Sequence, residues 1–446
     1  MKKTLLSMVA MMATCGAAMA QNGITEITSP KGYAFMVTAM SPNGKYIAGS
    51  NADTGSGFMY DRETKKLVEF DVADLNTDVD IDLQIKSVAN NGLAVGWNGP
   101  ASTFDFATGK CTAYGATDQY LFLGISPSGN YIVGARYDGT DEEGTPCIFN
   151  DGKPVDLPQP SDKFLGYTSA GASALSVSDD AMISGYFVDD MATRPATVWS
   201  LNKDGKTFST YPISRRFFAP SSESTMPYAT FTCDQTTMSP NGKWLIINFE
   251  KYVGDYESVM GVARYNLEND SVEFFVPNEE EDERFAEVGC EAYGSAVAND
   301  GTIIGFYGGA YGPRVGFMWK KGDSTIQTLS TAFPGATRLA AYDEGNFNTP
   351  SSISEDGRYI TGFAFAAPAD ADEDDPDAGN YVSWILDTQD PNATTPTSVE
   401  SVAKDNNKLA KVKARYAVDG TRRDTKFKGI NILRMTNGKT VKRIDK

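Results

Sequence analysis

Histidine is absent from this sequence of 446 residues. Its absence excludes Ser-His-Asp and Cys-His catalytic groups, together with the commonest general base that works near neutral pH. Any catalysis would have to use carboxylate, Tyr, Lys or Arg side chains. Two enzyme classes meet that condition: a glycoside hydrolase with a pair of carboxyl groups, and a polysaccharide lyase using Tyr and Arg.

Long apolar runs are also lacking. The longest, from Leu5 to Ala13, follows Lys2 and Lys3 and precedes the triplet at residues 18–20 (AMA). This pattern predicts a secretory signal peptide over residues 1–20, cleaved after Ala20. No stretch reaches the roughly 18 consecutive apolar residues of a membrane helix, so we expect an exported protein that is not integral to the membrane. Cys15 would permit a lipoprotein, but the residues before it match that pattern weakly.

Cysteine is scarce, with five residues in the whole chain and none in a Cys-x-x-Cys pair. A zinc site is therefore not indicated. After removal of the signal peptide, Cys111, Cys147, Cys233 and Cys290 remain, in a compartment where disulfides can persist. Cys233 and Cys290 occupy similar places in successive repeats, which favours a disulfide between them. Four buried thiols acting as small hydrophobic side chains are the alternative.

Basic residues are fewer than acidic ones, 40 against 58, which gives a net charge of −18. Residues 404–446 reverse this balance, with 14 basic and 4 acidic residues, so the preceding body is strongly acidic. Such a body argues against nucleic acid as a partner, because affinity for nucleic acid comes mainly from neutralising phosphates.

A repeated turn-and-strand pattern organises the chain. An Asn-Gly or Asp-Gly turn, which supplies the positive φ of a tight hairpin, precedes a strand rich in Tyr, Trp, Ile and Val. The copies are residues 41–49, 88–96, 126–134, 176–185, 239–247, 296–305 and 354–362. The fourth copy has Ala181 where glycine is usual. Spacing of this kind suits four-stranded propeller blades, so we predict an all-β, seven-bladed β-propeller.

A second pattern supports this register. After each turn-and-strand copy comes an apolar strand with an aromatic residue: Tyr60, Phe104, Phe149, Trp199, Tyr265, Trp319 or Trp384. A further short strand follows in six units, but the seventh lacks it. Residues 24–27 (ITEI) read as an unpaired strand. Pairing it with the seventh blade would close the ring and remove an exposed edge. We interpret the aromatic and glycine residues of these repeats as scaffold.

The repeat resembles the extracellular HAF-type repeats of secreted bacterial propellers, in which a strand ending in Gly precedes a strand ending in an aromatic residue. The resemblance spans roughly Gly32 to Leu386, and residues 315–319 (VGFMW) are its nearest counterpart. The chain departs from that family in having no histidine. The resemblance implies the fold and leaves the function open, because propellers host many unrelated functions.

The pattern changes after residue 389. We predict a propeller over 21–389, a linker over 390–407 and a small β module over 408–446. The last part resembles the C-terminal sorting region of the type IX secretion system of Bacteroidetes, through Tyr416, Asp419-Gly420, residues 428–432 (KGINI), residues 437–439 (NGK) and a basic end. The resemblance implies that secretion machinery is a partner and that the protein is released or attached at the outer-membrane surface. A periplasmic location, or a module without an export role, is the alternative.

The face opposite the tight turns is expected to be built from long loops, and exposed loops on a rigid scaffold are where binding usually resides. Tyr and Arg side chains, which are favoured at interfaces, concentrate there. The candidate ligand-binding residues are Arg215, Tyr228, Arg284, Tyr293, Tyr307, Tyr311, Arg314, Arg338 and Tyr342. Packing of these rings within the loops is the alternative. If the protein is an enzyme, the candidate catalytic carboxylates are Glu291, Asp343 and Glu344.

An acidic loop suggests calcium as a possible cofactor, with Asp370, Asp372 and Asp374 as ligands, because hard cations prefer several oxygens. Its spacing does not match an EF-hand, and a solvated acidic loop is the alternative; no other cofactor is indicated. These features favour a secreted or surface-attached protein that binds a glycan or a protein through the long-loop face. A carbohydrate-active enzyme and a structural adhesin or surface-layer component remain the alternatives.

Overall fold

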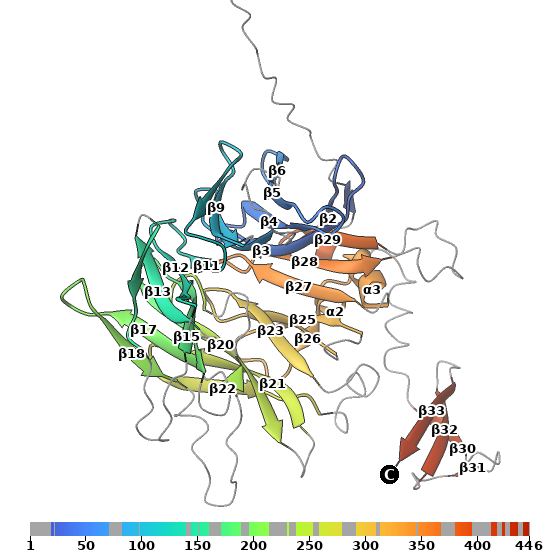
Figure 1. Ribbon diagram of the computed structural model, residues 1–446. Helices are drawn as coiled ribbons and strands as arrows, with labels where there is room; N and C mark the ends of the chain where they lie inside the picture. Colours follow the sequence, from blue (N-terminus) through green and yellow to red (C-terminus); the bar gives the residue numbers. More distant parts are fainter. Residues whose placement is uncertain are drawn as a thin grey trace, which may run out of the picture.

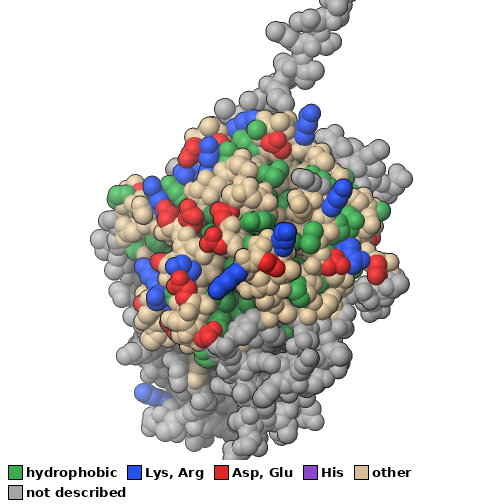
Figure 2. Space-filling view, turned by 90° about the vertical axis from the view of Figure 1, so that its left-hand side faces the viewer, with side chains coloured by type: hydrophobic (Ala, Val, Ile, Leu, Met, Phe, Trp, Pro, Cys, Tyr) green, Lys and Arg blue, Asp and Glu red, His purple; other side chains and the backbone are tan. Residues whose placement is uncertain are grey.

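The computed structural model describes residues 19–21, 23–70, 83–97, 99–139, 144–150, 152–159, 171–188, 196–213, 230–231, 238–252, 258–278, 291–308, 313–344, 347–366, 380–394, 412–416, 422–423, 429–435 and 440–445. Within these ranges no helix is both long and apolar enough to cross a membrane. On the face that Figure 2 shows, basic side chains lie among acidic ones, so charge of one sign does not form a broad patch there.

Seven antiparallel sheets form the blades of a ring, which confirms the predicted seven-bladed propeller (Figure 1). In chain order the blades contain β3–β6, β7–β10, β11–β14, β15–β18, β19–β22, β23–β26, and β27–β29 with β2. In blades one to four the strands are β3 (Phe35–Met40), β4 (Tyr46–Asn51), β5 (Gly57–Asp61), β6 (Leu67–Phe70), β7 (Gln84–Val88), β8 (Leu93–Trp97), β9 (Ala101–Asp105), β10 (Lys110–Tyr114), β11 (Tyr120–Ile125), β12 (Ile132–Arg136), β13 (Thr145–Asn150), β14 (Lys153–Asp156), β15 (Gly171–Val177), β16 (Met182–Val188), β17 (Ala196–Leu201) and β18 (Phe208–Pro212).

The remaining blades contain β19 (Thr230–Phe231), β20 (Trp244–Tyr252), β21 (Ser258–Asn266), β22 (Ser271–Phe275), β23 (Ala292–Val297), β24 (Ile303–Tyr307), β25 (Val315–Trp319), β26 (Gln327–Thr328), β27 (Asn348–Ile353), β28 (Tyr359–Ala366), β29 (Asn380–Asp387) and β2 (Ile24–Ile27). Within the described residues, the short helices α2 (Leu329–Ala332) and α3 (Thr337–Glu344) lie between blades six and seven, and α4 (Pro391–Thr394) follows β29. Residues 390–394 were assigned to the linker from sequence, yet Ala393 is buried in the core of the ring.

The tight turns join the first and second strands of every blade, as predicted. Glycine has positive φ at the key turn position in six blades, at residues 44, 92, 129, 242, 301 and 357. In the fourth blade Ala181 adopts the same conformation, with φ 57°. The degenerate fourth copy therefore keeps the backbone geometry of the others and loses only the residue that adopts it without strain.

Hydrogen bonds link the turn of one blade to the turn of the next. Where the second turn residue is proline and has no N–H, the following residue donates to an Asn or Asp side chain on the next blade. Examples are Asn43 N to Asn90 Oδ1 (2.8 Å) and Ser128 N to Asp179 Oδ1 (2.9 Å). Where that residue has an N–H, it donates to the next blade's carbonyl, as Glu355 N does to Pro42 O (2.7 Å).

Such bonds are present at six of the seven junctions in the described part of the chain, the others being Asn90 N to Pro127 O, Asn241 N to Asn299 Oδ1 and Asn299 N to Glu355 O. We call this set of linked turns the turn ring. It makes the tight-turn face a hydrogen-bonded plate.

A β-bulge in the innermost strand explains the glycine that ends most repeats. The register of the first and second strands shifts in six blades, for example between Phe122 and Gly124. A Cβ on Gly134 of β12 would lie 1.8 Å from the carbonyl oxygen of Leu121 in β11. The second strand can approach the bulge only because this position has no side chain.

Apolar clusters fill the junctions between blades. The seven aromatic residues of the third strands are all buried, and Trp199 and Trp384 are fully so. One cluster covers each junction; that between blades six and seven contains Ile304, Met318, Ile353 and Trp384. Each blade therefore depends on both neighbours to cover its apolar faces.

The N-terminal strand closes the ring, as predicted from sequence. β2 pairs antiparallel with β29, with Ile24 opposite Leu386 and Ile27 opposite Ser383. β1 (Met19–Gln21) pairs in turn with the outer edge of β2 and contains the predicted cleavage site after Ala20.

Helix α3 secures this closing strand. Glu26 Oε1 accepts hydrogen bonds from Arg338 Nε (2.8 Å) and from the Tyr342 hydroxyl (2.6 Å). Burial lowers the pKa of Arg338, but the bonds with Glu26 and the nearby Tyr342 outweigh this effect, so its pKa lies above the ordinary value. Burial and Glu26 raise the pKa of Tyr342. The Glu26 contacts thus hold β2 against α3 by charge-assisted hydrogen bonds.

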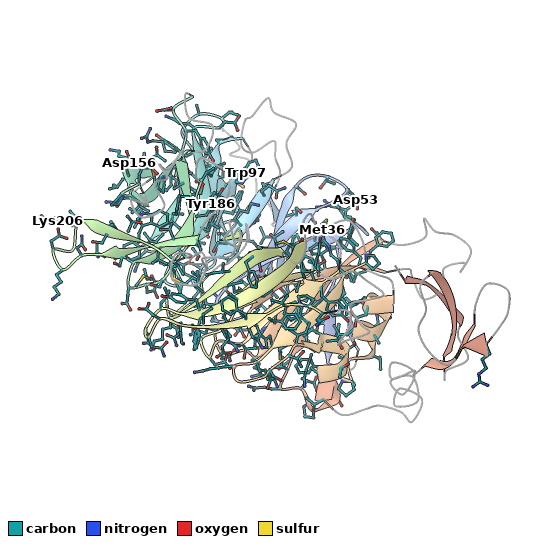
Figure 3. The ribbon with its side chains drawn as sticks, turned by 90° about the horizontal axis from the view of Figure 1, so that it is seen from below. Met36, Asp53, Trp97, Asp156, Tyr186 and Lys206 are labelled. Atoms are coloured by element: carbon teal, nitrogen blue, oxygen red, sulfur yellow. The ribbon has the colours of Figure 1, made fainter. Side chains whose placement is uncertain are left out.

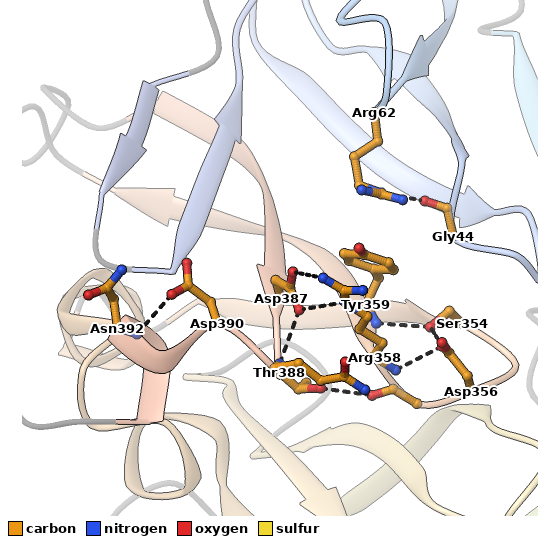
Figure 4. Close-up of polar contacts among 12 residues, drawn as sticks. Gly44, Arg62, Ser354, Asp356, Arg358, Tyr359, Asp387, Thr388, Asp390 and Asn392 are labelled. Atoms are coloured by element: carbon orange, nitrogen blue, oxygen red, sulfur yellow. Dashed lines mark hydrogen bonds and ion pairs between the residues drawn. The ribbon is translucent and has the colours of Figure 1, made fainter.

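A second set of contacts ties blade seven to blade one. The Arg62 guanidinium lies 3.7 Å from the centre of the Tyr359 ring and its Nε donates to the Gly44 carbonyl (2.9 Å). Arg358 forms two hydrogen bonds with Asp387 (3.0 and 2.9 Å), as Figure 4 shows. The Arg62–Tyr359 contact therefore holds blade seven to blade one by a cation–π interaction in addition to the apolar cluster, while the Arg358–Asp387 pair joins β29 to the turn before β28 within blade seven.

The C-terminal residues form a separate antiparallel sheet with the order β31 (Arg422–Arg423), β30 (Val412–Tyr416), β32 (Gly429–Met435) and β33 (Thr440–Asp445). Short strands were expected here from sequence. Cys147 is a buried free thiol, and Cys111 is half-buried. The predicted Cys233–Cys290 disulfide lies outside the described residues.

The bulge argument predicts a large cost for Gly134→Ala. The added methyl group collides with a backbone carbonyl, and overpacking of this kind costs about 3 kcal/mol of unfolding free energy. Gly357→Ala is the matched control: it has φ 73° but nothing within 4 Å of the new Cβ, so only left-handed strain of about 1 kcal/mol applies. Urea unfolding of both variants measures the difference, and equal losses would contradict the explanation.

The closing contacts predict that Glu26→Ala destabilises the ring by about 2 kcal/mol, because two donors lose a charged acceptor. Glu69→Ala is the control: its partner Lys31 is 3.8 Å away with a side chain 63% exposed, and such surface pairs contribute about 0–1 kcal/mol. Unfolding by urea again provides the measurement. A Glu26→Ala loss no greater than that of the control would show that the contacts with α3 do not stabilise closure.

Candidate ligand-binding site

Only some of the predicted ligand-binding residues belong to the described residues. Tyr293, Tyr307, Arg314, Arg338 and Tyr342 can be placed. Outside the described residues lie Arg215, Tyr228, Arg284, Tyr311, and the proposed calcium ligands Asp370, Asp372 and Asp374.

The backbone of Arg314 is fixed by a junction between blades. Its carbonyl accepts from Asn348 N (2.9 Å), and it forms a parallel bridge with Phe347. In earlier blades glycine carbonyls make the corresponding bond, such as Gly55 O with Leu83 N (2.8 Å). Blade six therefore places a long cationic side chain where blades one to three have none.

The Arg314 guanidinium lies between two phenylalanine rings. Its carbon is 4.6 Å from the centre of the Phe306 ring and 4.7 Å from that of Phe347. Burial lowers the pKa of Arg314, and the nearby Tyr293 and Tyr381 oppose that shift. The two rings hold the guanidinium through cation–π contacts in a partly dehydrated setting.

Tyr293, in β23 of the same blade, adds a further ring to these contacts. Its ring stacks on Phe306 with centroids 5.2 Å apart, and its hydroxyl donates to Glu291 Oε2 (2.9 Å). Tyr293 and Glu291 are each half-buried. A carboxylate, a phenol and a guanidinium are thus held at one end of blade six.

Blade seven completes the cluster with aromatic residues. Phe347 contacts Phe363 and Tyr381, with centroids 6.0 and 6.1 Å apart, and Tyr381 also contacts Phe365 at 5.5 Å. Phe347, Phe365 and Tyr381 are half-buried, whereas Phe363 is buried. We name the whole set the Arg314 cluster: Glu291, Tyr293, Phe306, Arg314, Phe347, Phe363, Phe365 and Tyr381. It offers partly exposed rings beside polar groups that are already oriented.

Four phenylalanines and Tyr381 were missed by the sequence reasoning. Phe306 and Phe363 directly follow Gly305 and Gly362, the glycines that end their repeats. Trp97 and Tyr186 occupy the same place in blades two and four. Figure 3 labels these last two side chains. The position after this glycine was the signal that could have identified Phe306 and Phe363, whereas Phe347, Phe365 and Tyr381 do not follow such a glycine.

Other predicted residues belong to the scaffold. Tyr307 is buried at 4% exposure in the cluster between blades five and six. Tyr342 is fully buried, stacks on Trp384 and, like Arg338, bonds Glu26. Tyr342 is therefore not exposed as expected: α3 packs this side chain against Trp384 in the core of the propeller.

The candidate catalytic carboxylates lie in different parts of the structure. Glu291 belongs to the Arg314 cluster. Asp343 accepts from Ser330 Oγ (2.6 Å) and Asn348 Nδ2 (2.9 Å), which ties α3 to α2 and β27. Glu344 is the last residue of α3. Asp343 therefore has a role in holding the scaffold.

Comparison with known proteins found matches among solved structures only. No protein-family model matches the chain, and no curated protein matches it. The WD40 repeats of RRP9 are 10% identical, with TM-score 0.46, over 83% of this chain and 99% of that one. The β-propeller domain of Cps50 (Swd1) from Myceliophteria thermophila is 10% identical, with TM-score 0.45, over 80% and 97%.

Streptogramin B lyase is 13% identical, with TM-score 0.43, over 81% of this chain and 96% of that one. Likenesses this distant carry no argument about ligands or reactions.

Proposed function

We propose that this is an exported or surface-attached binding protein that takes a glycan or protein ligand at the Arg314 cluster. The observation that supports it most is the arrangement of half-buried rings around one guanidinium at the long-loop end of blades six and seven. Aromatic and arginine side chains of this kind are the usual anchors of binding surfaces. Aromatic ring faces also suit sugar rings, which present C–H groups to them.

The rigidity of the site favours binding. The Arg314 backbone is held by a junction hydrogen bond, and its side chain is held by two rings. Groups that are fixed before the ligand arrives lose little conformational entropy when it binds. Under this proposal the signal peptide and the C-terminal module deliver the ring to the outer-membrane surface or the medium, and calcium at residues 370–374 stays an optional addition.

The test is affinity for a panel of host and bacterial polysaccharides and surface proteins, with and without a calcium chelator, by the chain from Gln21 to Lys446. Arg314→Ala combined with Tyr381→Ala should weaken binding at least tenfold, because hot-spot residues each contribute about 2 kcal/mol or more. Phe274→Ala is the control, since Phe274 is an exposed ring (44%) on the outer strand of blade five.

Unchanged binding by the double variant would place the ligand elsewhere and contradict the site. Sugar release in the same wells would contradict a pure binding role and direct attention to Glu291, Asp343 and Glu344.

A further inference from the structure

A cavity of about 50 Å³ lies at the centre of the ring, on the side of the tight turns. All seven blades contribute to its walls, and Pro42, Pro127 and Pro240 of the turn ring belong to its lining. This is the face opposite the Arg314 cluster. Hydrogen bonds between neighbouring turns at six of the seven junctions surround the mouth of the cavity.

One charged side chain lines this cavity among the described residues, Lys86 of blade two. The rest of the lining is aliphatic or carries hydroxyls, although the chain contains 58 acidic residues. In the described part of the chain, Lys86 has no ion pair or hydrogen bond from its ammonium group. A half-buried cation without a counter-charge is costly, so the cavity favours an anion.

A β-bulge in the backbone fixes the position of Lys86. It is the bulged residue of β7, where the register with β8 shifts between Ile85 and Ser87. Thr38 Oγ1 of blade one donates to the Ile85 carbonyl (2.6 Å), which pins the chain just before the bulge. Bulges redirect side chains, and here the redirected side chain is the one that lines the central cavity. Leu123 and Leu175, the bulged residues of blades three and four, line it as well.

Two hydroxyl-bearing residues line the same cavity as the lysine. Ser87 and Ser352 line the cavity, and within the described residues neither hydroxyl has a hydrogen-bond partner. Together with the ammonium group they provide donors for two oxygens of one ligand. Met40, Leu123 and Leu175 supply apolar wall next to these donors.

We infer that the central cavity binds a small aliphatic carboxylate, with its oxygens on Lys86, Ser87 and Ser352 and its alkyl part against Leu123 and Leu175. The size fits this class. A water needs about 10–15 Å³ of such volume, so the space corresponds to a few water molecules, as acetate or propionate require. The site is independent of the proposed function of the long-loop face.

The experiment is a titration of the chain from Gln21 to Lys446 with ¹³C-labelled acetate and with propionate, observed by NMR at constant ionic strength. Wild-type protein should show saturable binding. Lys86→Met, which keeps the length of the side chain and removes its charge, should weaken binding at least tenfold. Lys206→Met is the matched control: Lys206 lies at the tip of the β17–β18 hairpin, away from the ring centre (Figure 3), and its loss should change nothing.

Leu123→Phe provides a second variant, because it reduces the cavity volume and leaves the charge in place. It should also abolish binding, and circular dichroism confirms that each variant is folded. Binding by Lys86→Met equal to wild type would overturn the inference, as would the absence of saturable binding to wild type. Displacement of acetate by inorganic phosphate at equal concentration would overturn the carboxylate class.

Discussion

The structure depends on closure of the ring. Each blade is a thin sheet whose two apolar faces are covered by its neighbours, so an open end would expose the clusters around Trp384 and Phe35 to water. Pairing of β2 with β29 removes that end. Glu26, held by Arg338 and Tyr342, then links the start of the propeller to a helix more than 300 residues later in the chain.

The two faces of the ring differ in how freely their side chains can vary from blade to blade. Turn-to-turn hydrogen bonds restrict the tight-turn face, where proline and Asx residues alternate at the second turn position through the first six blades. On the other face, the junction bond from Asn348 N to Arg314 O uses backbone atoms alone. A backbone bond tolerates any side chain, so glycine in one blade can be arginine in another. This difference is why the Arg314 cluster can form at blades six and seven without disturbing the scaffold.

Much of the fold could be predicted because its signals are local. A positive φ at Gly44 or Gly357 is a property of the turn itself, and the buried ring of Trp199 follows from its place in a repeating strand. Burial of Tyr342 could not be predicted, since it depends on how α3 packs against a strand from the other end of the chain. The Arg314 cluster was predicted in part: Tyr293 and Arg314 are exposed-loop residues by sequence, whereas Phe347 and Tyr381 reach them only through the junction of two blades.

Hydrogen exchange of the β2 amides, measured on the chain from Gln21 to Lys446, tests ring closure most directly. If β2 is an integral part of the propeller, its hydrogen-bonded amides should exchange only through the same opening that exposes the interior strands β12 and β28, with matching free energies. Exchange of β2 that is orders of magnitude faster, while the other strands stay protected, would show that the ring is stable without it and would contradict the account.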